Sequence, residues 1–418
     1  MTTASLSRRL GTADAVVLGL ASMIGAGVFT VFAPAAAAAG SALLLALLLA
    51  AAVAFCNATS TAQLAAAHPV AGGAYAYGRT ELGPWWGFLA GWSFVIGKTA
   101  SCAAMATAFG AYVAPGGWER PFGIAAVAVL TLVNCLGITR TASAARAIVS
   151  VAVAALIVAV AAGFASWRPG AAAESALQGS PYGILQAAGL LFFAFAGYAR
   201  IATLGEEVRD PAKTIPRAIG IAFAGALLLY LLVAVALLGG LGVDRLSASA
   251  APLAELAERS GWPGAAVAVG IGAAAAALGA LLALTAGISR TMLAMAREAD
   301  LPRLLAHVHP GSGVPRRAQL AVGIAACLLV ALTDLRTAIG FSSFGVLLYY
   351  FVANLSALRQ APAARRYPRL LAAGGAIGCL LLVATVPLPA LLTGIAVLAA
   401  GIGARLLLGP ARNRRSSS

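Results

Sequence analysis

The chain has 418 residues, of which 61% are hydrophobic and only 10% are charged, and its mean hydropathy is +0.93. Soluble domains carry about 25% charged residues, so this composition excludes a string of soluble domains and predicts an integral membrane protein. The net charge of +15 is spread thinly through short gaps between apolar runs, which argues against a nucleic-acid-binding protein.

Apolar runs long enough to cross a bilayer, about 20 residues each, recur along the whole chain. Glycine, proline and charged residues separate them. They predict twelve membrane helices, at 13–38, 41–63, 84–113, 121–138, 144–167, 182–203, 217–240, 263–297, 316–334, 336–358, 368–386 and 389–408.

Basic residues are distributed unevenly between the two sides of these spans. With an even number of spans both termini share a side, and placing them inside the cell puts 22 Lys and Arg residues inside and 5 outside. The excess of basic residues in cytoplasmic segments of membrane proteins supports this orientation. We therefore expect a multi-pass plasma-membrane protein with a cytoplasmic N-terminal tail at 1–12 and a cytoplasmic basic tail at 409–418.

The residues that usually carry catalysis or bind metal are sparse. Five cysteines lie in or beside apolar runs without a CxxC motif or a Cys/His cluster, and the three histidines fall in predicted connections. No Asp or Glu lies deep inside a predicted span. We therefore expect reduced thiols, no metal, no cofactor and no enzymatic activity.

Glycines interrupt two predicted spans, the first and the sixth, at corresponding places in the two halves of the chain. The first span contains Ile24-Gly25-Ala26-Gly27, and the sixth contains Phe192-Phe193-Ala194-Phe195-Ala196-Gly197-Tyr198. Either motif alone is compatible with close helix packing, but the pair indicates an inverted-repeat transporter with its site near the membrane midplane. An unwound segment offers N–H groups to a carboxylate and carbonyls to an ammonium group, which suits a zwitterion.

Four segments occur in a characteristic order along the chain. They are Ile24 to Phe29, the loop from Pro69 to Tyr77 with Gly83-Pro84, the sixth-span motif with Glu206-Glu207-Val208-Arg209-Asp210-Pro211, and Ser289-Arg290-Thr291 with Leu301-Pro302. As a set, they resemble the amino acid–polyamine–organocation (APC) superfamily of permeases.

The resemblance implies an all-α fold of the leucine-transporter type, a five-plus-five inverted repeat with interrupted helices 1 and 6 and two extra C-terminal helices. The first repeat would be 13–167, the second 182–358, and the extra helices 368–408. It also implies a secondary active transporter that works by alternating access. We expect a neutral amino acid as substrate, with polyamines, cationic amino acids or other amines as alternatives and a substrate sensor as an alternative of a different class.

The resemblance also assigns substrate contacts to the two interrupted spans. The aromatic ring of Phe193 would close over the substrate as a gate, and an ordinary packing aromatic is the alternative. Backbone groups would bind the carboxylate at Ile24, Gly25, Ala26 and Gly27, and would receive the amino group at Phe193, Ala194 and Ala196, beside Gly197.

Lys98 is the one ionisable side chain well inside a predicted span. Burying a charge there costs at least about 2.5–3.5 kcal/mol, so a functional role is expected, with snorkelling to the interface as the alternative. We expect Lys98 to place a protonatable charge beside the substrate, where it could couple transport to protons, attract the carboxylate or repel cations. Some proton-coupled members of the family carry a coupling lysine on the fifth helix, where Ala152 stands here.

Two further sets of polar residues are candidates for ion binding or gating. Thr285 and Ser289 lie four residues apart on one helix face and form a candidate cation site with first-span carbonyls, although hydrogen bonds within their own helix are the alternative. A cytoplasmic ion-pair network is expected from Glu206, Glu207, Arg209 and Arg217.

Overall fold

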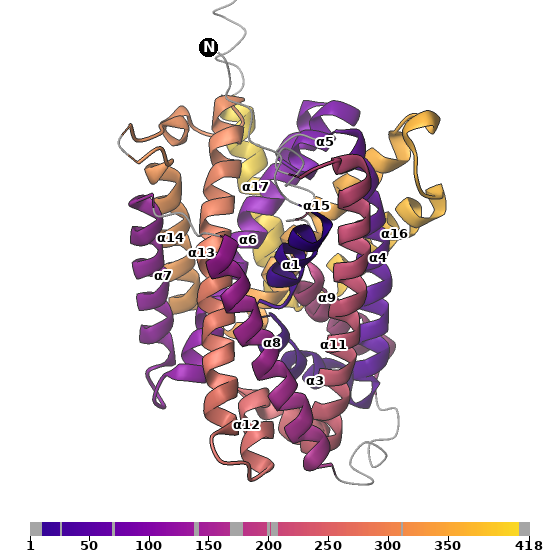
Figure 1. Cartoon of the computed structure of the whole chain (residues 1–418). Coiled ribbons are helices and arrows are strands. Elements are labelled where there is room, and N and C mark those ends of the chain that lie inside the picture. The colour runs from indigo at the N-terminus through magenta and orange to yellow at the C-terminus, as the bar shows by residue number, and fades with distance from the viewer. Residues whose placement is uncertain are drawn as a thin grey trace, which may run out of the picture.

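The computed structural model describes residues 11–25, 27–68, 72–137, 142–167, 179–198, 201, 208–310 and 312–408. The helices run side by side in one bundle, with α1 (Thr12–Met23) near its centre and α7 (Glu119–Cys135) and α14 (Arg316–Leu332) along one flank (Figure 1). Short helices lie at the two ends of the bundle, α5 (Ala74–Glu81) at one and α12 (Pro252–Arg259) at the other.

Eight helical stretches of the described residues are long and apolar enough to cross a membrane, judged by length and composition. The first is Thr12–Thr30, made of α1 and α2 (Gly27–Thr30), and the second is Phe32–Ala67, made of α3 (Phe32–Ala39), a short 3₁₀ turn and α4 (Leu43–Ala67). The others lie in α6 (Pro84–Val113), α8 (Ala142–Ala165), α11 (Pro211–Ala248), α13 (Ala265–Arg297), α15 (Leu335–Arg359) and α17 (Leu388–Leu408).

Four shorter helices complete the bundle. They are α7, α9 (Pro181–Phe195), α14 and α16 (Arg369–Thr385), of 15 to 17 residues each. All twelve predicted spans overlap helices of the structure, which confirms an all-helical, multi-pass membrane protein.

Helix starts follow local capping chemistry. The Ser180 hydroxyl accepts a hydrogen bond from the Gly183 amide at 3.0 Å, and Pro181 then occupies the first turn of α9, where its missing N–H costs nothing. The Asp334 carboxylate caps α15 in the same way, at 2.8 Å from the Thr337 amide. These caps fix where the two helices begin.

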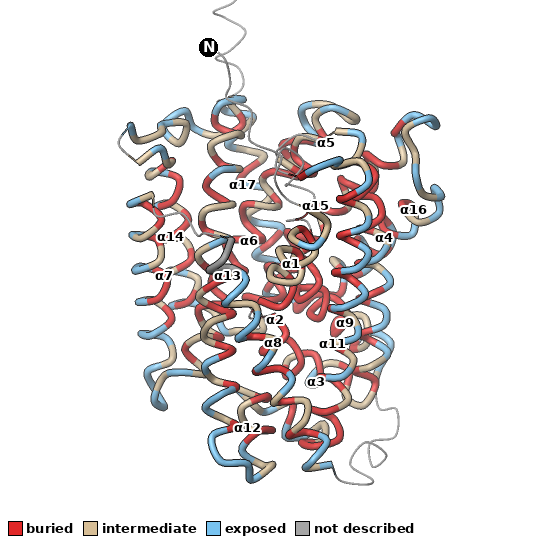
Figure 2. Tube along the Cα trace, in the orientation of Figure 1, coloured by how far each residue is buried: buried red, intermediate tan, exposed pale blue. Residues whose placement is uncertain are grey.

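Helices α6 and α15 lie in the middle of the bundle. In the most apolar 18-residue stretch of each helix, 72% of α6 and 83% of α15 is buried, against 17% of α17. Glycines bring their backbones together: a Cβ on Gly97 would lie 3.0 Å from the Cα of Gly345. Such small residues permit close helix packing where lipid supplies no hydrophobic driving force. Buried residues accordingly gather on the inner helices, while outer helices turn exposed faces outward (Figure 2).

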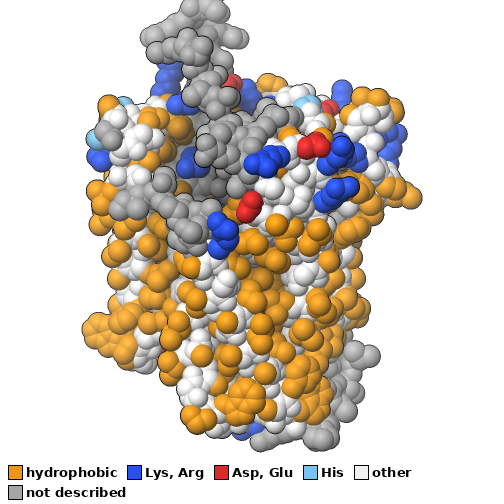
Figure 3. Space-filling view, viewed as in Figure 1, with side chains coloured by type: hydrophobic (Ala, Val, Ile, Leu, Met, Phe, Trp, Pro, Cys, Tyr) orange, Lys and Arg blue, Asp and Glu red, His pale blue; other side chains and the backbone are white. Residues whose placement is uncertain are grey.

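Charged side chains gather at one end of the molecule. Figure 3 shows Lys and Arg side chains around the end that carries the start of α1, with hydrophobic side chains covering much of the surface below. We call this the arginine-rich end; α5 and the connection between α15 and α16 also lie there (Figure 1). An apolar belt bounded by charge at one end is the surface expected of a protein embedded in a bilayer.

Candidate substrate site

At both predicted interruptions a helix ends in the described part of the chain. Helix α1 ends at Met23 and α2 begins at Gly27, while α9 ends at Phe195 and a turn follows at 196–198. Of the first-span residues predicted to bind substrate, Ala26 lies outside the described residues, and Ile24, Gly25 and Gly27 lie at the break.

The two breaks contact each other through glycines. A Cβ on Gly27 would lie 3.1 Å from the Cα of Ala194 and 3.4 Å from the Cδ1 of Phe193. A Cβ on Gly197 would overlap the backbone of Ser22 and Met23. The structure therefore brings together the two segments that sequence analysis proposed as halves of one site.

Tyr230 of α11 bridges the two breaks. Its hydroxyl lies 2.6 Å from the carbonyl oxygen of Met23 and 3.0 Å from that of Ala194, and the side chain is fully buried. A tyrosine hydroxyl has one proton to donate, so it can serve one of these carbonyls at a time. Tyr230 was not among the residues predicted from the sequence, although a tyrosine in an apolar span is a recognisable signal because its hydroxyl needs a buried partner.

Lys98 lies at the second break. Its Nζ donates to the carbonyl oxygen of Ala196 at 3.3 Å, and the Tyr350 hydroxyl of α15 donates to the same oxygen at 3.3 Å. Ala196 is the C-terminal cap of α9, where the helix dipole favours a cation. The lysine is 8% exposed and points inward, so the snorkelling alternative does not describe it.

The carbonyls predicted to receive a substrate amino group already accept hydrogen bonds from the protein. The Phe193 carbonyl accepts from the Ala196 amide at 3.4 Å, and that of Ala194 accepts from Tyr230. Each carbonyl oxygen has two lone pairs, so, counting bonds among the described residues, the oxygens of Phe193 and Ala194 can each accept one more hydrogen bond, whereas that of Ala196 already accepts two. The Phe193 side chain itself is buried, with 7% exposed, against the first break.

The hydroxyls of the candidate cation site bond within their own helix. Thr285 donates to the Leu281 carbonyl at 2.9 Å, and Ser289 donates to that of Ala286 at 3.0 Å. The side-chain amide of Asn134 on α7 donates to the Thr285 hydroxyl at 2.6 Å. The two hydroxyls thus make the hydrogen bonds within their own helix that were the alternative to cation binding. Cation binding by Thr285 and Ser289 stays a prediction.

Part of the predicted ion-pair network falls outside the described residues, namely Glu206 and Glu207. Arg209 lies just before α11, where its carbonyl accepts a hydrogen bond from the Thr214 hydroxyl at 2.7 Å. Arg217 is exposed on the first turns of α11. The network as predicted therefore stays a prediction.

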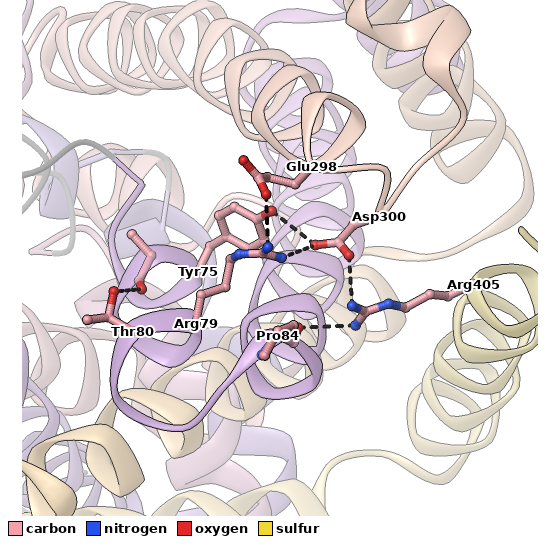
Figure 4. Close-up of polar contacts among 8 residues, drawn as sticks. Tyr75, Arg79, Thr80, Pro84, Glu298, Asp300 and Arg405 are labelled. Atoms are coloured by element: carbon pink, nitrogen blue, oxygen red, sulfur yellow. Dashed lines mark hydrogen bonds and ion pairs between the residues drawn. The ribbon is translucent and has the colours of Figure 1, made fainter. Parts of the chain in front are cut away.

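A different ion-pair network is present at the arginine-rich end, centred on Asp300 in the turn after α13 (Figure 4). One carboxylate oxygen of Asp300 lies 2.9 Å from Arg79 of α5, and the other lies 2.9 Å from Arg405 of α17. Arg79 also pairs with Glu298 at 2.9 Å, and the Tyr75 hydroxyl donates to Asp300 at 3.0 Å. Three helices distant in sequence are thus joined at one carboxylate.

Aromatic side chains support the same network. The Arg405 guanidinium lies 4.3 Å from the ring centroid of Trp85 and 4.6 Å from that of Phe88, at the start of α6. Its Nη1 donates to the Pro84 carbonyl at 3.2 Å. Burial raises the pKa of the Asp300 carboxyl above its ordinary value, and the two guanidinium groups oppose that shift.

Asp300→Asn is expected to destabilise the folded protein by about 3–5 kcal/mol, because removing the carboxylate of a buried ion pair leaves the Arg405 charge uncompensated, although Arg79 keeps its pair with Glu298. The Asp300 side chain is 3% exposed and that of Arg405 is 14% exposed. Thermal unfolding in detergent tests this, with Asp210→Asn as the matched control because Asp210 pairs with Lys213 at the surface. Equal unfolding temperatures for the two variants would contradict a structural role for Asp300.

Comparison with known protein sequences places the chain in a family. The sequence model described as "Amino acid permease" matches residues 10–415. An uncharacterized transporter of Mycobacterium bovis is 55% identical over 400 residues, covering 96% of this chain and 91% of that protein.

Two more distant relatives have names that specify substrates. The chloroplastic cationic amino acid transporter 7 of Arabidopsis thaliana is 28% identical, covering 85% of this chain and 66% of its own length. The branched-chain amino acid permease BcaP of Bacillus subtilis is 24% identical, covering 85% and 81% respectively. With the family model matched over nearly its whole length and the glycine-interrupted helices in contact, the chain belongs to the amino acid permease family of the APC superfamily.

Proposed function

We propose that this protein is a secondary active transporter that moves a neutral amino acid across the plasma membrane by alternating access. The contact between the two interrupted helices carries the proposal. Backbone carbonyls from both breaks meet there, and Tyr230, Tyr350 and Lys98 hydrogen-bond to them. Discontinuous helices of this kind supply polar backbone groups for substrate at the membrane midplane.

The proposed architecture has twelve membrane helices, with repeats at 13–167 and 182–358 followed by two additional helices at 368–408. The overlap of each predicted span with a helix supports it. Both termini are proposed to be cytoplasmic, since the arginine-rich end then faces the cytoplasm (Figure 3).

In the proposed complex the substrate carboxylate binds at the first break, near Ile24, Gly25 and Gly27. The substrate ammonium binds at the second break, where Lys98 now donates to the Ala196 carbonyl. Two cations on one carbonyl repel each other, so binding displaces the lysine or removes its proton. Phe193 forms the aromatic side of the pocket.

Lys98 also supports the choice of a neutral substrate. The substrate ammonium already has to displace the lysine or its proton, so a second cationic group on the substrate side chain would add another uncompensated buried charge, whereas an apolar side chain adds none. Relatives named for cationic and for branched-chain amino acids both exist, so the two substrate classes must be compared directly.

Uptake into proteoliposomes tests the proposal. Purified protein is reconstituted and supplied with labelled leucine, alanine, arginine or spermidine, with and without an inward proton gradient. We expect saturable uptake of a neutral amino acid that the proton gradient increases. Faster uptake of arginine or spermidine would contradict the neutral specificity, and binding of a neutral amino acid without any flux would contradict transport and indicate a sensor.

A further inference from the structure

A second polar pocket lies at the arginine-rich end, away from the helix breaks. It is enclosed by α4, the end of α15, the start of α16 and the connection between α15 and α16. Its empty volume is about 210 Å³, which includes open solvent at the mouth. Two arginines line it: Arg365 in the connection and Arg369 at the start of α16. Ser60 and Tyr367 line it as well. Among the described residues, the ten that line this pocket include no acidic side chain.

Two donors in the pocket lack partners in the part of the chain that the structure describes. Ser60 of α4 is 2% exposed, and its hydroxyl makes no hydrogen bond there. The Nε atom of Arg365 is likewise buried without an acceptor. Buried donors are nearly always hydrogen-bonded in folded proteins, so these two indicate a missing acceptor.

The walls of the pocket are held in place by neighbouring contacts. The Gln63 side chain donates to the Ala357 carbonyl, and its oxygen accepts from the amides of Arg366 and Tyr367, each at 3.4 Å. Arg366 in turn donates to the Ala212 carbonyl at 2.7 Å, at the start of α11. The pocket is therefore attached to α11, the helix that carries Tyr230.

The chemistry of the pocket selects an anion. Helix α16 begins at Arg369 with no side-chain cap, so its first amides and its dipole add positive potential to the two guanidinium groups. The pocket has room for about one water molecule, which is enough for a single anion oxygen. A phosphate group fits, because one oxygen can enter while the others stay at the mouth with Arg365 and Arg369.

We propose that this pocket binds a phosphate group, supplied by the headgroup of an anionic phospholipid in the adjoining leaflet or by inorganic phosphate. Leu370, the residue after Arg369, is 83% exposed, so an apolar surface that lipid can cover lies next to a residue that lines the pocket.

Lipid titration tests the proposal. Protein in phosphatidylcholine nanodiscs is compared with protein in discs of increasing phosphatidylglycerol content, and the unfolding temperature reports binding. We expect phosphatidylglycerol to raise the unfolding temperature of the wild type by about 2 °C or more. Ser60→Ala and Arg365→Gln each remove one donor to the anion, so about tenfold more phosphatidylglycerol should be needed for the same shift.

Arg359→Gln is the matched control, because Arg359 is exposed at the end of α15 and does not line the pocket. It should respond to phosphatidylglycerol as the wild type does. Inorganic phosphate added to phosphatidylcholine discs distinguishes the two sources: an equal shift identifies the soluble anion, and no shift identifies the lipid. If neither source shifts the wild type, or if Arg359→Gln loses the response as Arg365→Gln does, the pocket holds only water and the proposal is wrong.

Discussion

Lys98→Met is expected to lower uptake of the transported amino acid about tenfold or more without lowering the stability of the protein. In the proposed complex the lysine gives up its bond to the Ala196 carbonyl, or its proton, when the substrate ammonium binds, and methionine cannot make this exchange. A loss of 1.4 kcal/mol in this coupling corresponds to a factor of about ten. Methionine has a similar length and carries no charge, so the variant also loses the cost of burying an ammonium group that is 8% exposed. Uptake and unfolding temperature should therefore move independently.

The measurement pairs initial uptake rates in proteoliposomes with thermal unfolding of the same preparations. If Lys98 couples transport to protons, the remaining uptake in the variant should no longer respond to a proton gradient, while exchange of internal for external substrate should persist. Lys213→Met is the matched control, because Lys213 lies at the surface beside Asp210, with 72% of its side chain exposed. Unchanged uptake and unchanged proton response in Lys98→Met would remove the lysine from the mechanism.

The sequence predicted those features of the fold that depend on local properties. Hydropathy along the chain locates each membrane helix, because every backbone group in a bilayer must bond within its own helix. Glycine content locates the two breaks, because a residue without a side chain lets another backbone approach, as Gly27 does against Ala194. Lys98 was recognisable for a similar reason, since a charge in an apolar span is costly wherever it points.

Contacts between residues far apart in the sequence could not be predicted from local properties. The Asp300 network joins α5, the turn after α13 and α17, and nothing in the sequence near Asp300 indicates that Arg405 is its partner. The Glu206, Glu207, Arg209 and Arg217 group was proposed instead because its members are close in sequence. Tyr230 and Tyr350 are similar cases: each is a recognisable polar side chain in an apolar helix, but its partner carbonyl is set by tertiary packing.

The pocket at Ser60 shows a further limit. The hydroxyl of a serine or threonine in a membrane helix ordinarily donates to the backbone carbonyl one turn earlier, as those of Ser101 and Thr61 do here. Only the structure reveals that the Ser60 hydroxyl has no such partner in the described part of the chain. A sequence pattern can name a polar residue, but it cannot say which of its hydrogen bonds is missing.

Gly197→Ala is expected to remove most uptake and to lower the unfolding temperature, because the added methyl group would overlap the backbone of Ser22 and Met23. Inserting a methyl group into a packed interior costs about 1–3 kcal/mol, and a backbone neighbour cannot rotate away as a side chain can. The strain falls where α1 and α9 are interrupted, so the carbonyls bridged by Tyr230 would separate even in molecules that still fold.

Gly287→Ala provides the matched control for this substitution. Gly287 lies inside α13, and a Cβ there meets nothing within 4 Å. Alanine is favoured over glycine in a helix by about 1 kcal/mol, so this variant should be as stable as the wild type or more so and should transport normally. If Gly197→Ala unfolded at the same temperature as Gly287→Ala and retained full uptake, the two breaks would not be in tight contact. A site built from both of them would then have no basis.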